Sequence, residues 1–179
     1  MYSYLTGRIA RPAALNAARR AGFAGGIMAG GTRYGVEIRS ALPADAGELA
    51  GMLGGTARDM ANRLEALLKD PASSVLVATG WNGAAIGVIA LHRHPSLAAD
   101  RPLARITALA VAEDERRNGI GRLLVKAGAQ AARAGGCEML EAAPPEGEDG
   151  GAGFLSALGF IPAGANLARP LRKRAADAA

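Results

Sequence analysis

The chain has 179 residues, of which 50% are hydrophobic and 21% charged, and this is the composition of one ordinary globular domain. Its formal net charge of +5 comes from five arginines before residue 37, because residues 37–179 contain 16 basic and 16 acidic side chains. A domain that binds nucleic acid carries its excess charge on the folded surface, and only 4% of this chain is aromatic. The composition therefore argues against a nucleic-acid-binding domain, and no segment approaches the roughly 20 apolar residues of a membrane span.

The first 35 residues form a basic extension before the predicted domain at 36–174, and an alanine-rich tail follows at 175–179. Three interpretations of the extension stay open. In the first interpretation it is a targeting segment, because an arginine pair precedes a weakly apolar stretch. In the second it contains an additional helix at 12–24. The third interpretation, which we favour, is a poorly ordered extension with Met28 as an alternative start.

A single cysteine, Cys137, cannot form an internal disulfide, and we expect it to be a buried apolar residue rather than a nucleophile. A chain without a disulfide framework fits a reducing compartment, so the predicted location is the cytoplasm. The sequence contains no cysteine and histidine cluster with the spacing of a metal site, and we expect no metal.

The body of the chain alternates segments of strand and helix character. Thr56 is placed to cap the second helix, and Asp70-Pro71 ends it. Asn82-Gly83 favours a tight hairpin between two neighbouring strands. In chain order we expect a strand at 36–39, helices at 43–53 and 60–68, strands at 74–79, 85–91 and 103–112, a helix at 119–134, a strand at 137–142, a helix at 151–158, and strands at 160–163 and 167–174.

The most informative motif is the run 116–122, Arg-Arg-Asn-Gly-Ile-Gly-Arg, which lies where the strand at 103–112 gives way to a helix. Gly119 and Gly121 permit backbone conformations and close approaches that a Cβ would prevent. The first turn of a helix also leaves main-chain N–H groups unpaired, and the helix dipole adds partial positive charge there. The junction is therefore suited to bind an anion such as a phosphate.

The spacing Arg-x-x-Gly-x-Gly, filled by Arg116, Gly119 and Gly121, resembles the acyl-CoA pyrophosphate loop of the GNAT superfamily of N-acetyltransferases. Residues 36–46 are similar to the opening strand and first helix of that family, and 154–160, Phe-Leu-Ser-Ala-Leu-Gly-Phe, to its last helix. The resemblance implies a single-domain, bacterial-type member with an α/β fold, in which a mixed, mostly antiparallel sheet of about seven strands carries helices on both faces.

The same resemblance implies that acetyl-CoA is the cosubstrate and that a primary amine attacks its thioester directly, without a side-chain nucleophile. A main-chain N–H at Leu109 or Ala110 would be the oxyanion donor, and Lys126 could add charge near the phosphates. Arg122 and Lys126 are explained equally well as solvated surface cations. The residues implied in cofactor binding are Leu109, Ala110, Val111, Arg116, Arg117, Asn118, Gly119, Ile120, Gly121 and Arg122.

The chain departs from the family pattern at the general acid. Many members place a tyrosine after the phenylalanine of the last helix, and this chain has Leu155 there. Ser156 is turned about 100° further around the helix and is interpreted as a surface residue. A thiol with a pKa of about 8.5 leaves with modest help, so the missing tyrosine weakens the case for catalysis without excluding it.

The general base is less well defined by the sequence. Glu141, near the end of the strand at 137–142, is the candidate that we select for this role. The three acids at 113–115 are interpreted as solvated groups before the glycine turn. His92 and His94 flank a strand end that could reach the acceptor, although such histidines are more often surface residues.

The acceptor is predicted to be a small-molecule or peptide amine, in a cleft shaped by the loop at 53–59 and the loop before the last helix. The second loop carries Glu146, Glu148 and Asp149, which would favour a cationic acceptor; a solvated loop is the alternative interpretation. A homodimer through the two closing strands is compatible with the sequence.

Two other functions stay open. One is a non-catalytic module that binds acyl-CoA as a sensor or partner, which is motivated by Leu155. The other is an RNA-associated factor that uses the basic N-terminus, although the predicted partners include neither nucleic acid nor a membrane.

Overall fold

A computed structural model describes residues 35–143 and 151–171, and one seven-stranded sheet organises them in the order β1-β2-β3-β4-β5-β7-β6. All neighbouring pairs are antiparallel except β4 and β5, which are parallel. This mixed sheet of seven strands confirms the predicted fold class. The strands are β1 (Glu37–Ser40), β2 (Ser73–Thr79), β3 (Ala85–His94), β4 (Leu103–Val111), β5 (Met139–Ala142), β6 (Ile161–Ala163) and β7 (Asn166–Pro170).

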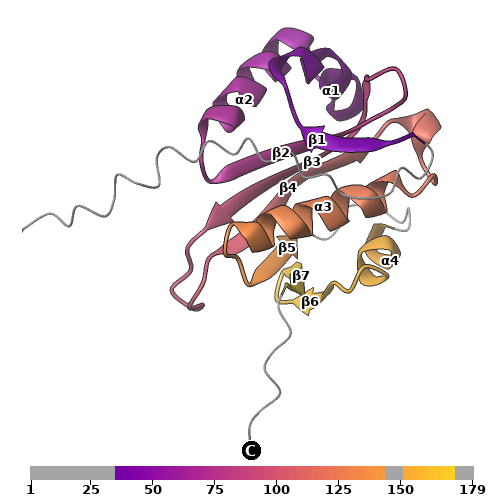
Figure 1. Cartoon of the computed structure of the whole chain (residues 1–179). Helices are drawn as coiled ribbons and strands as arrows, with labels where there is room; N and C mark the ends of the chain where they lie inside the picture. The colour runs from indigo at the N-terminus through magenta and orange to yellow at the C-terminus, as the bar shows by residue number, and fades with distance from the viewer. Residues whose placement is uncertain (1–34, 144–150, 172–179) are drawn as a thin grey trace, which may run out of the picture.

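Helices cover both faces of the sheet, with α1 and α2 on one face and α3 on the other (Figure 1). No helix in the described part of the chain is long and apolar enough to cross a membrane. The helices are α1 (Ala46–Leu53), α2 (Ala57–Lys69), α3 (Ile120–Ala134) and α4 (Gly151–Ser156), with 3-10 turns η2 (Pro43–Asp45) and η3 (Glu113–Glu115).

Each helical layer has its own apolar core. On the α1 and α2 side, Leu49 and Leu64 pack against Val77 and Val88, which are buried in the sheet. On the α3 side, apolar residues spaced along the helix meet the other face of the strands. The fully buried residues there include Ile89, Leu124, Val125, Cys137 and Leu140.

Local signals in the sequence locate several element boundaries correctly. Thr56 Oγ1 accepts a hydrogen bond from Asp59 N at 3.1 Å, as predicted for the cap of α2. At the other end of the domain, Phe160 N donates to Leu155 O and Gly159 N donates to Ser156 O. With Gly159 at φ +84°, these two bonds form a Schellman motif that closes the last turn, and the regular helix α4 ends at Ser156, two residues before the predicted end.

The connection between β2 and β3 is looser than the predicted tight turn at Asn82-Gly83. Five residues, 80–84, separate the two strands. Gly83 N donates to Gly80 O at 2.9 Å and Gly83 has φ +79°, so the glycine closes a four-residue turn that begins at Gly80. The hairpin pairing itself is confirmed.

Other expectations differ in extent or lie outside the described residues. Strand β3 extends to His94, and β5 begins at Met139 rather than at Cys137. Strand β7 ends at Pro170, before the predicted end. The N-terminal extension, the acidic loop with Glu146, Glu148 and Asp149, and the alanine-rich tail lie outside the described residues.

Candidate functional site

The loop between β4 and α3 presents a row of main-chain N–H groups. Arg116 N donates to Glu113 O at 3.4 Å, and Leu123 N donates to Gly119 O at 3.1 Å. Between these two, within the described part of the chain, no main-chain N–H from residue 117 to residue 122 donates a hydrogen bond. These unpaired donors at the start of a helix are the arrangement that binds anions.

Two left-handed residues give this loop its shape. Gly119 is the N-cap of α3 with φ +80°, and Arg117 has φ +66°. Arg117 is the one non-glycine residue with positive φ among those that the structure describes. An arginine costs free energy in this conformation, and such residues cluster at ligand-binding sites.

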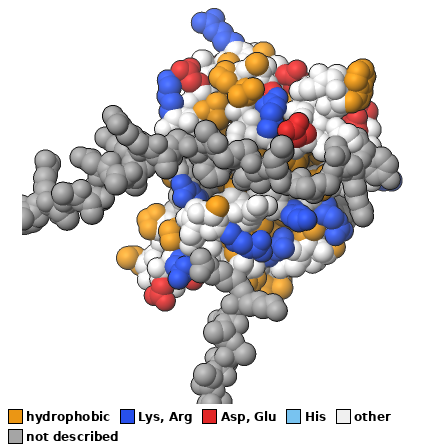
Figure 2. Space-filling view, in the orientation of Figure 1, with side chains coloured by type: hydrophobic (Ala, Val, Ile, Leu, Met, Phe, Trp, Pro, Cys, Tyr) orange, Lys and Arg blue, Asp and Glu red, His pale blue; other side chains and the backbone are white. Residues whose placement is uncertain are grey.

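Basic side chains surround these N–H groups. Arg116, Arg117 and Arg122 are exposed, and so is Lys126, one turn further along α3. Figure 2 shows Lys and Arg side chains gathered on the face of the molecule over α3. The positive charge that the sequence placed in the motif therefore lies on the surface around the loop, where it favours an anionic ligand.

Strand β4 has one open edge next to this loop. It pairs with β5 only at residues 103–106, whereas its pairing with β3 continues to Val111. Ala112 N donates to Ile86 O at 2.9 Å, so the alternation of an antiparallel pair directs the main-chain groups of Ala110 toward β3. The main-chain groups of Leu109 and Val111 consequently point to the open edge.

The open edge begins at an irregularity in β4. In the pairing with β3, Ala108 lies opposite Ala90 but Ile106 lies opposite Leu91, so Thr107 is an extra, bulged residue. The last residue of β4 that pairs with β5 is Ile106. The bulge at Thr107 therefore lies at the point where β4 and β5 part.

Helix α4 approaches this edge through Phe154. A Cβ on Gly121 would lie 3.2 Å from Phe154 Cζ and 3.9 Å from Val111 Cγ2, so the glycine permits close packing of the three residues. Leu155, at the position where the resemblance expects tyrosine, is buried in the core on the α3 side. Ser156 is exposed, as expected for a surface residue.

A cavity of about 480 Å³ opens on the opposite face of the sheet, between the two N-terminal helices and strands β2, β3 and β4. Thr107 and Ala108 line it, so it reaches the bulge in β4. The loop at 53–59, which the sequence analysis placed at the acceptor cleft, contributes Leu53. The other lining residues are mainly apolar, including Leu49, Met60, Leu64, Leu67, Val75, Val88 and Ala90, with Arg63, Asp70, Ser73 and His92 among them.

Asp70, Ser73 and His92 form a polar cluster in this cavity. Ser73 Oγ donates to Asp70 Oδ2 at 2.6 Å, and Ala72 N donates to Asp70 Oδ1 at 2.9 Å. These two bonds, with the neighbouring imidazole, lower the pKa of Asp70 below its usual value, because they favour the ionised carboxylate. His92 Nδ1 lies 3.5 Å from Asp70 Oδ2.

Glu141 lies elsewhere on the same face of the sheet. It is opposite Arg105 in the β4–β5 pairing, and its Oε2 is 3.9 Å from His94 Nε2. Arg105 Nη2 in turn donates to Asn166 Oδ1 at 2.7 Å. The predicted base therefore sits beside a second imidazole, just before the point where β4 and β5 part.

The remaining candidates have structural surroundings. Glu113 and Asp114 are exposed in η3, and Glu115 accepts a hydrogen bond from Asn118 Nδ2 at 3.3 Å. Cys137 is buried, as predicted, and burial raises the pKa of its thiol. Among the described residues, no group of three or more His, Cys, Asp or Glu side chains could hold a metal ion.

Sequence reasoning missed Asp70, Ser73 and Thr107. It assigned Asp70 to the end of a helix, which is correct but incomplete. The register of β2 against β3 places Ser73 opposite His92, and this pairing over 19 positions is what completes the cluster. The predicted hairpin contained this signal, because counting outward from the turn at Asn82-Gly83 places Ser73 opposite His92.

Comparison with known proteins identifies the family of the chain. A model of the acetyltransferase (GNAT) family matches residues 55–160, which is more than half of the chain. A search of curated protein sequences found no significant match.

Solved structures share the fold. A GNAT phosphinothricin acetyltransferase from Sinorhizobium meliloti in complex with acetyl-CoA is 20% identical, with a TM-score of 0.67, and the match covers 79% of this chain and 91% of that one. A GNAT N-acetyltransferase from Escherichia coli in complex with CoA is 22% identical, with a TM-score of 0.59 and coverage of 80% and 85%. A protein from Bacillus halodurans, described as a transcriptional regulator, is 21% identical, with a TM-score of 0.65 and coverage of 70% and 93%. The family match together with this fold shows that the chain belongs to the GNAT family of acetyltransferases.

Proposed function

We propose that the protein transfers the acetyl group of acetyl-CoA to a primary amine by direct attack of the amine on the thioester. The observation that carries the proposal is the row of unpaired N–H groups at 117–122 beside the open edge of β4. Acetyl-CoA joins a diphosphate to a chain of amides, and these two features of the structure are complementary to those two parts of the molecule. The two structural relatives that hold acetyl-CoA or CoA support the same ligand.

In this arrangement the diphosphate binds the N–H groups of residues 117–122, including those of Asn118, Gly119, Ile120 and Gly121. Arg116, Arg117, Arg122 and Lys126 add positive charge. The pantetheine amides pair with the main-chain groups of Leu109 and Val111, as an additional strand would. Ala110 directs its main-chain groups to β3, so it borders the ligand without donating to it.

The thioester then lies near the bulge at Thr107. The N–H of Leu109 points to the open edge and is the proposed oxyanion donor. Such a preorganised donor contributes about 3 to 4 kcal/mol to transition-state stabilisation in other acyl-transfer sites. The residue after Phe154 is the buried Leu155 and not a tyrosine, so the thiolate leaves without that general acid.

The amine approaches from the opposite face, through the cavity between α2 and the sheet. Most of its lining is apolar, with Leu49, Met60 and Leu64 on the helices and Val88 on β3. An acceptor with an apolar body gains free energy when these surfaces are removed from water. We therefore propose a primary amine on an apolar body as the acceptor.

The test is thiol release from acetyl-CoA by the full-length protein with a panel of primary amines. Turnover with 2-phenylethylamine above that with glycinamide supports both the reaction and the apolar acceptor. Tight acetyl-CoA binding without turnover on any amine would favour the alternative function, a sensor or partner module that binds acyl-CoA. That alternative is motivated by Leu155, which occupies the position where many family members have a tyrosine.

Two further proposals concern the oligomeric state and the cellular location of the protein. Strand β6 forms one edge of the sheet, and Ile161 on it is 58% exposed, so this edge is the proposed contact of a homodimer. Light scattering after size exclusion tests it, with Ile161→Lys as the disrupting variant. The cytoplasmic location is proposed from the single cysteine.

A further inference from the structure

One ring nitrogen of His92 is held between two oxygen atoms. Nδ1 lies 3.3 Å from Ser73 Oγ and 3.5 Å from Asp70 Oδ2. Ser73 uses its hydroxyl hydrogen in the bond to Asp70, so its oxygen faces the ring as an acceptor. Because both neighbours of Nδ1 are acceptors, the proton of a neutral imidazole resides on Nδ1 and the lone pair on Nε2.

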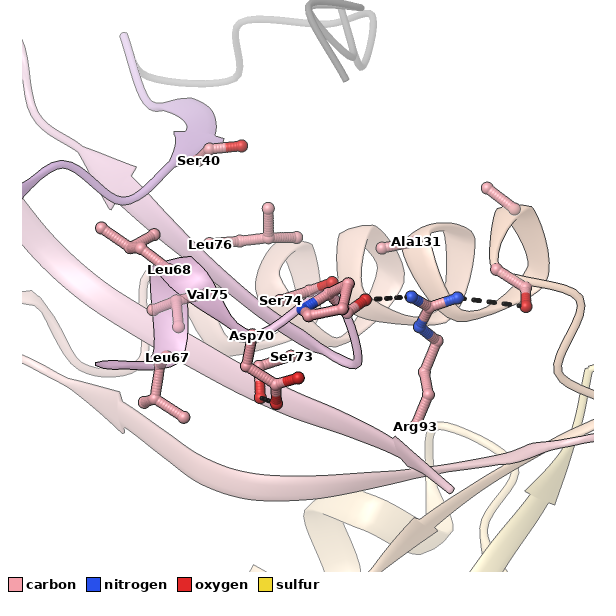
Figure 3. A pocket seen from close by; sticks show the side chains of 13 residues that line it. Ser40, Leu67, Leu68, Asp70, Ser73, Ser74, Val75, Leu76, Arg93 and Ala131 are labelled. Carbon is pink, nitrogen blue, oxygen red and sulfur yellow. Dashed lines mark hydrogen bonds between the residues drawn. The ribbon is translucent and has the colours of Figure 1, made fainter. Parts of the chain in front are cut away.

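The carboxylate of Asp70 is fixed by the loop that carries it. Asp70 Oδ1 accepts from Ala72 N, and Ala72 O accepts from Arg93 N at 2.8 Å. The Arg93 side chain donates to the carbonyl oxygens of Pro71 and Gly135, and so ties the loop to the end of α3 (Figure 3). The Asp70–Ser73 pair therefore presents a preorganised anion to the imidazole.

The geometry points to His92 as the general base that takes a proton from the acceptor amine, with Asp70 as the positioning residue that orients and stabilises the imidazolium. This inference rests on the proposed amine acetylation. His92 and Thr107 line the same cavity, and His92 lies opposite Arg105 in the pairing of β3 with β4. Strand geometry puts the Cα atoms of His92 and Thr107 about 8 Å apart, which the side chain and the amine, or one water, can bridge.

The proton and electron balance is complete with these groups. Nε2 of His92 takes one proton from the ammonium form of the acceptor, and the neutral nitrogen attacks the thioester carbonyl carbon. The new C–N bond forms as the carbonyl electron pair moves to oxygen, and the collapse of this intermediate breaks the C–S bond. The second nitrogen proton passes to the thiolate, which leaves as CoA thiol, and the imidazolium returns its proton to solvent.

Other charged groups around His92 come from several elements. Arg63 on α2 lines the same cavity, and Arg105 on β4 is the cross-strand neighbour. Among the residues that the structure describes, Asp70 is the acid in contact with His92, whereas Glu141 lies next to His94. Asp70 is in contact with the ring and is therefore the group that can orient it.

The experiment measures kcat/KM against pH for the full-length protein, with acetyl-CoA and 2-phenylethylamine. His92→Gln is expected to lower kcat/KM about 100-fold at neutral pH and to remove the rising limb of the pH profile that a general base produces. Affinity for acetyl-CoA should stay unchanged, and activity should recover in part at high pH, where the amine is already neutral. The comparison variant His94→Gln should retain the limb.

Two further measurements separate a catalytic from a structural role. Asp70→Asn is expected to lower kcat with KM unchanged, and Asp70→Glu should restore part of the loss, whereas a purely structural role would also lower the melting temperature or the affinity for acetyl-CoA. A long-range proton–nitrogen NMR spectrum of the wild type, which needs no acceptor amine, should show the His92 proton on Nδ1. A proton on Nε2 would overturn the inference.

The outcomes distinguish this inference from the function that it deepens. A kcat/KM equal to that of the wild type in His92→Gln would overturn the role of His92, and so would loss of the limb in His94→Gln instead. Neither result would contradict the proposed acetylation. Binding of acetyl-CoA by the wild type without thiol release to any amine would contradict the proposed function, and the base with it.

Discussion

The side chain of Arg116 reaches back to the strand that precedes it, and its Nε donates to the carbonyl oxygen of Val111 at 3.3 Å. Val111 is the last residue of β4, and its main-chain groups point away from β3. This bond therefore joins the loop at 116–122 to the open edge of the strand. The bond helps to hold in place, relative to each other, the two surfaces proposed to bind the diphosphate and the pantetheine.

Arg116→Ala should weaken acetyl-CoA binding about 10-fold, because it removes both a cation near the diphosphate and the bond that orients the loop. Isothermal titration calorimetry measures the effect. Arg58→Ala, at an exposed position in the first turn of α2, is the matched control and should leave the affinity unchanged. Equal affinities for Arg116→Ala and the wild type would contradict a role for this arginine.

Gly119→Val should abolish most acetyl-CoA binding while the fold persists. No atom lies within 4 Å of the position that a Cβ would take, but φ is +80°, which a β-branched residue adopts only at a cost of about 1 to 2 kcal/mol. The loop is expected to relax and to turn its N–H groups away. Calorimetry of acetyl-CoA binding together with circular dichroism checks both halves of the prediction.

The control for that variant is Gly164→Val. Gly164 also has a positive φ, +62°, with no atom within 4 Å of a Cβ, and it lies in the turn between β6 and β7. Similar backbone strain there should lower stability without changing the affinity for acetyl-CoA. If both variants bind equally well, the conformation of Gly119 is irrelevant to the ligand.

Asp45 should make stability depend on pH at the acid end. Arg39 donates to both of its carboxylate oxygens, at 2.7 and 2.8 Å, and Leu42 N donates to Oδ2 at 2.7 Å. The Arg39 bond first, and then the main-chain bond, lowers the pKa of Asp45 below its usual value. The stabilisation is therefore complete above that value and is lost as the pH falls through the lower pKa of the folded state.

Asp45→Asn should lower the free energy of unfolding by about 1 to 3 kcal/mol at pH 7, and by less at acid pH. Urea denaturation at several pH values measures this. Glu65→Gln, which removes the exposed pair with Lys69, is the control and should leave the free energy of unfolding essentially unchanged. An unchanged difference between Asp45→Asn and the wild type across the acid range would contradict the assignment.

Gly135→Ala should destabilise the fold by about 1 to 3 kcal/mol, because a Cβ would lie 2.7 Å from Arg93 Cδ and would displace that side chain. Gly47→Ala is the control, since it places a methyl group in open space on α1 and should stabilise the helix by about 0.5 to 1 kcal/mol. Thermal unfolding compares the two. Equal melting temperatures would show that Arg93 adapts without loss.

Local chemistry made much of the fold predictable. The Thr56 cap, the end of a helix before Pro71 and the glycine turn at 119–121 each follow from residues that are neighbours in sequence. The phosphate motif is of this kind, because a loop followed by a helix start is a local structure. The architecture of the sheet was predicted from the family resemblance, because local signals do not specify which strands pair.

The cavity proposed to take the acceptor was less predictable because it depends on contacts between distant residues. The sequence marks His92 only by its place near a strand end, and its partner Asp70 precedes it by 22 positions. The bulge at Thr107 arises from the register between two strands, and no glycine or proline marks it. Only the folded sheet brings these three residues to one cavity.

The most direct test of the account follows the main-chain amides of residues 117–122 by nitrogen–proton NMR during titration with acetyl-CoA and, separately, with S-acetylpantetheine, which lacks the diphosphate. The account predicts large shifts of the 117–122 amides with acetyl-CoA and small ones with S-acetylpantetheine, whereas Leu109 and Val111 shift with both. Amides at 117–122 that do not move when acetyl-CoA binds would contradict it.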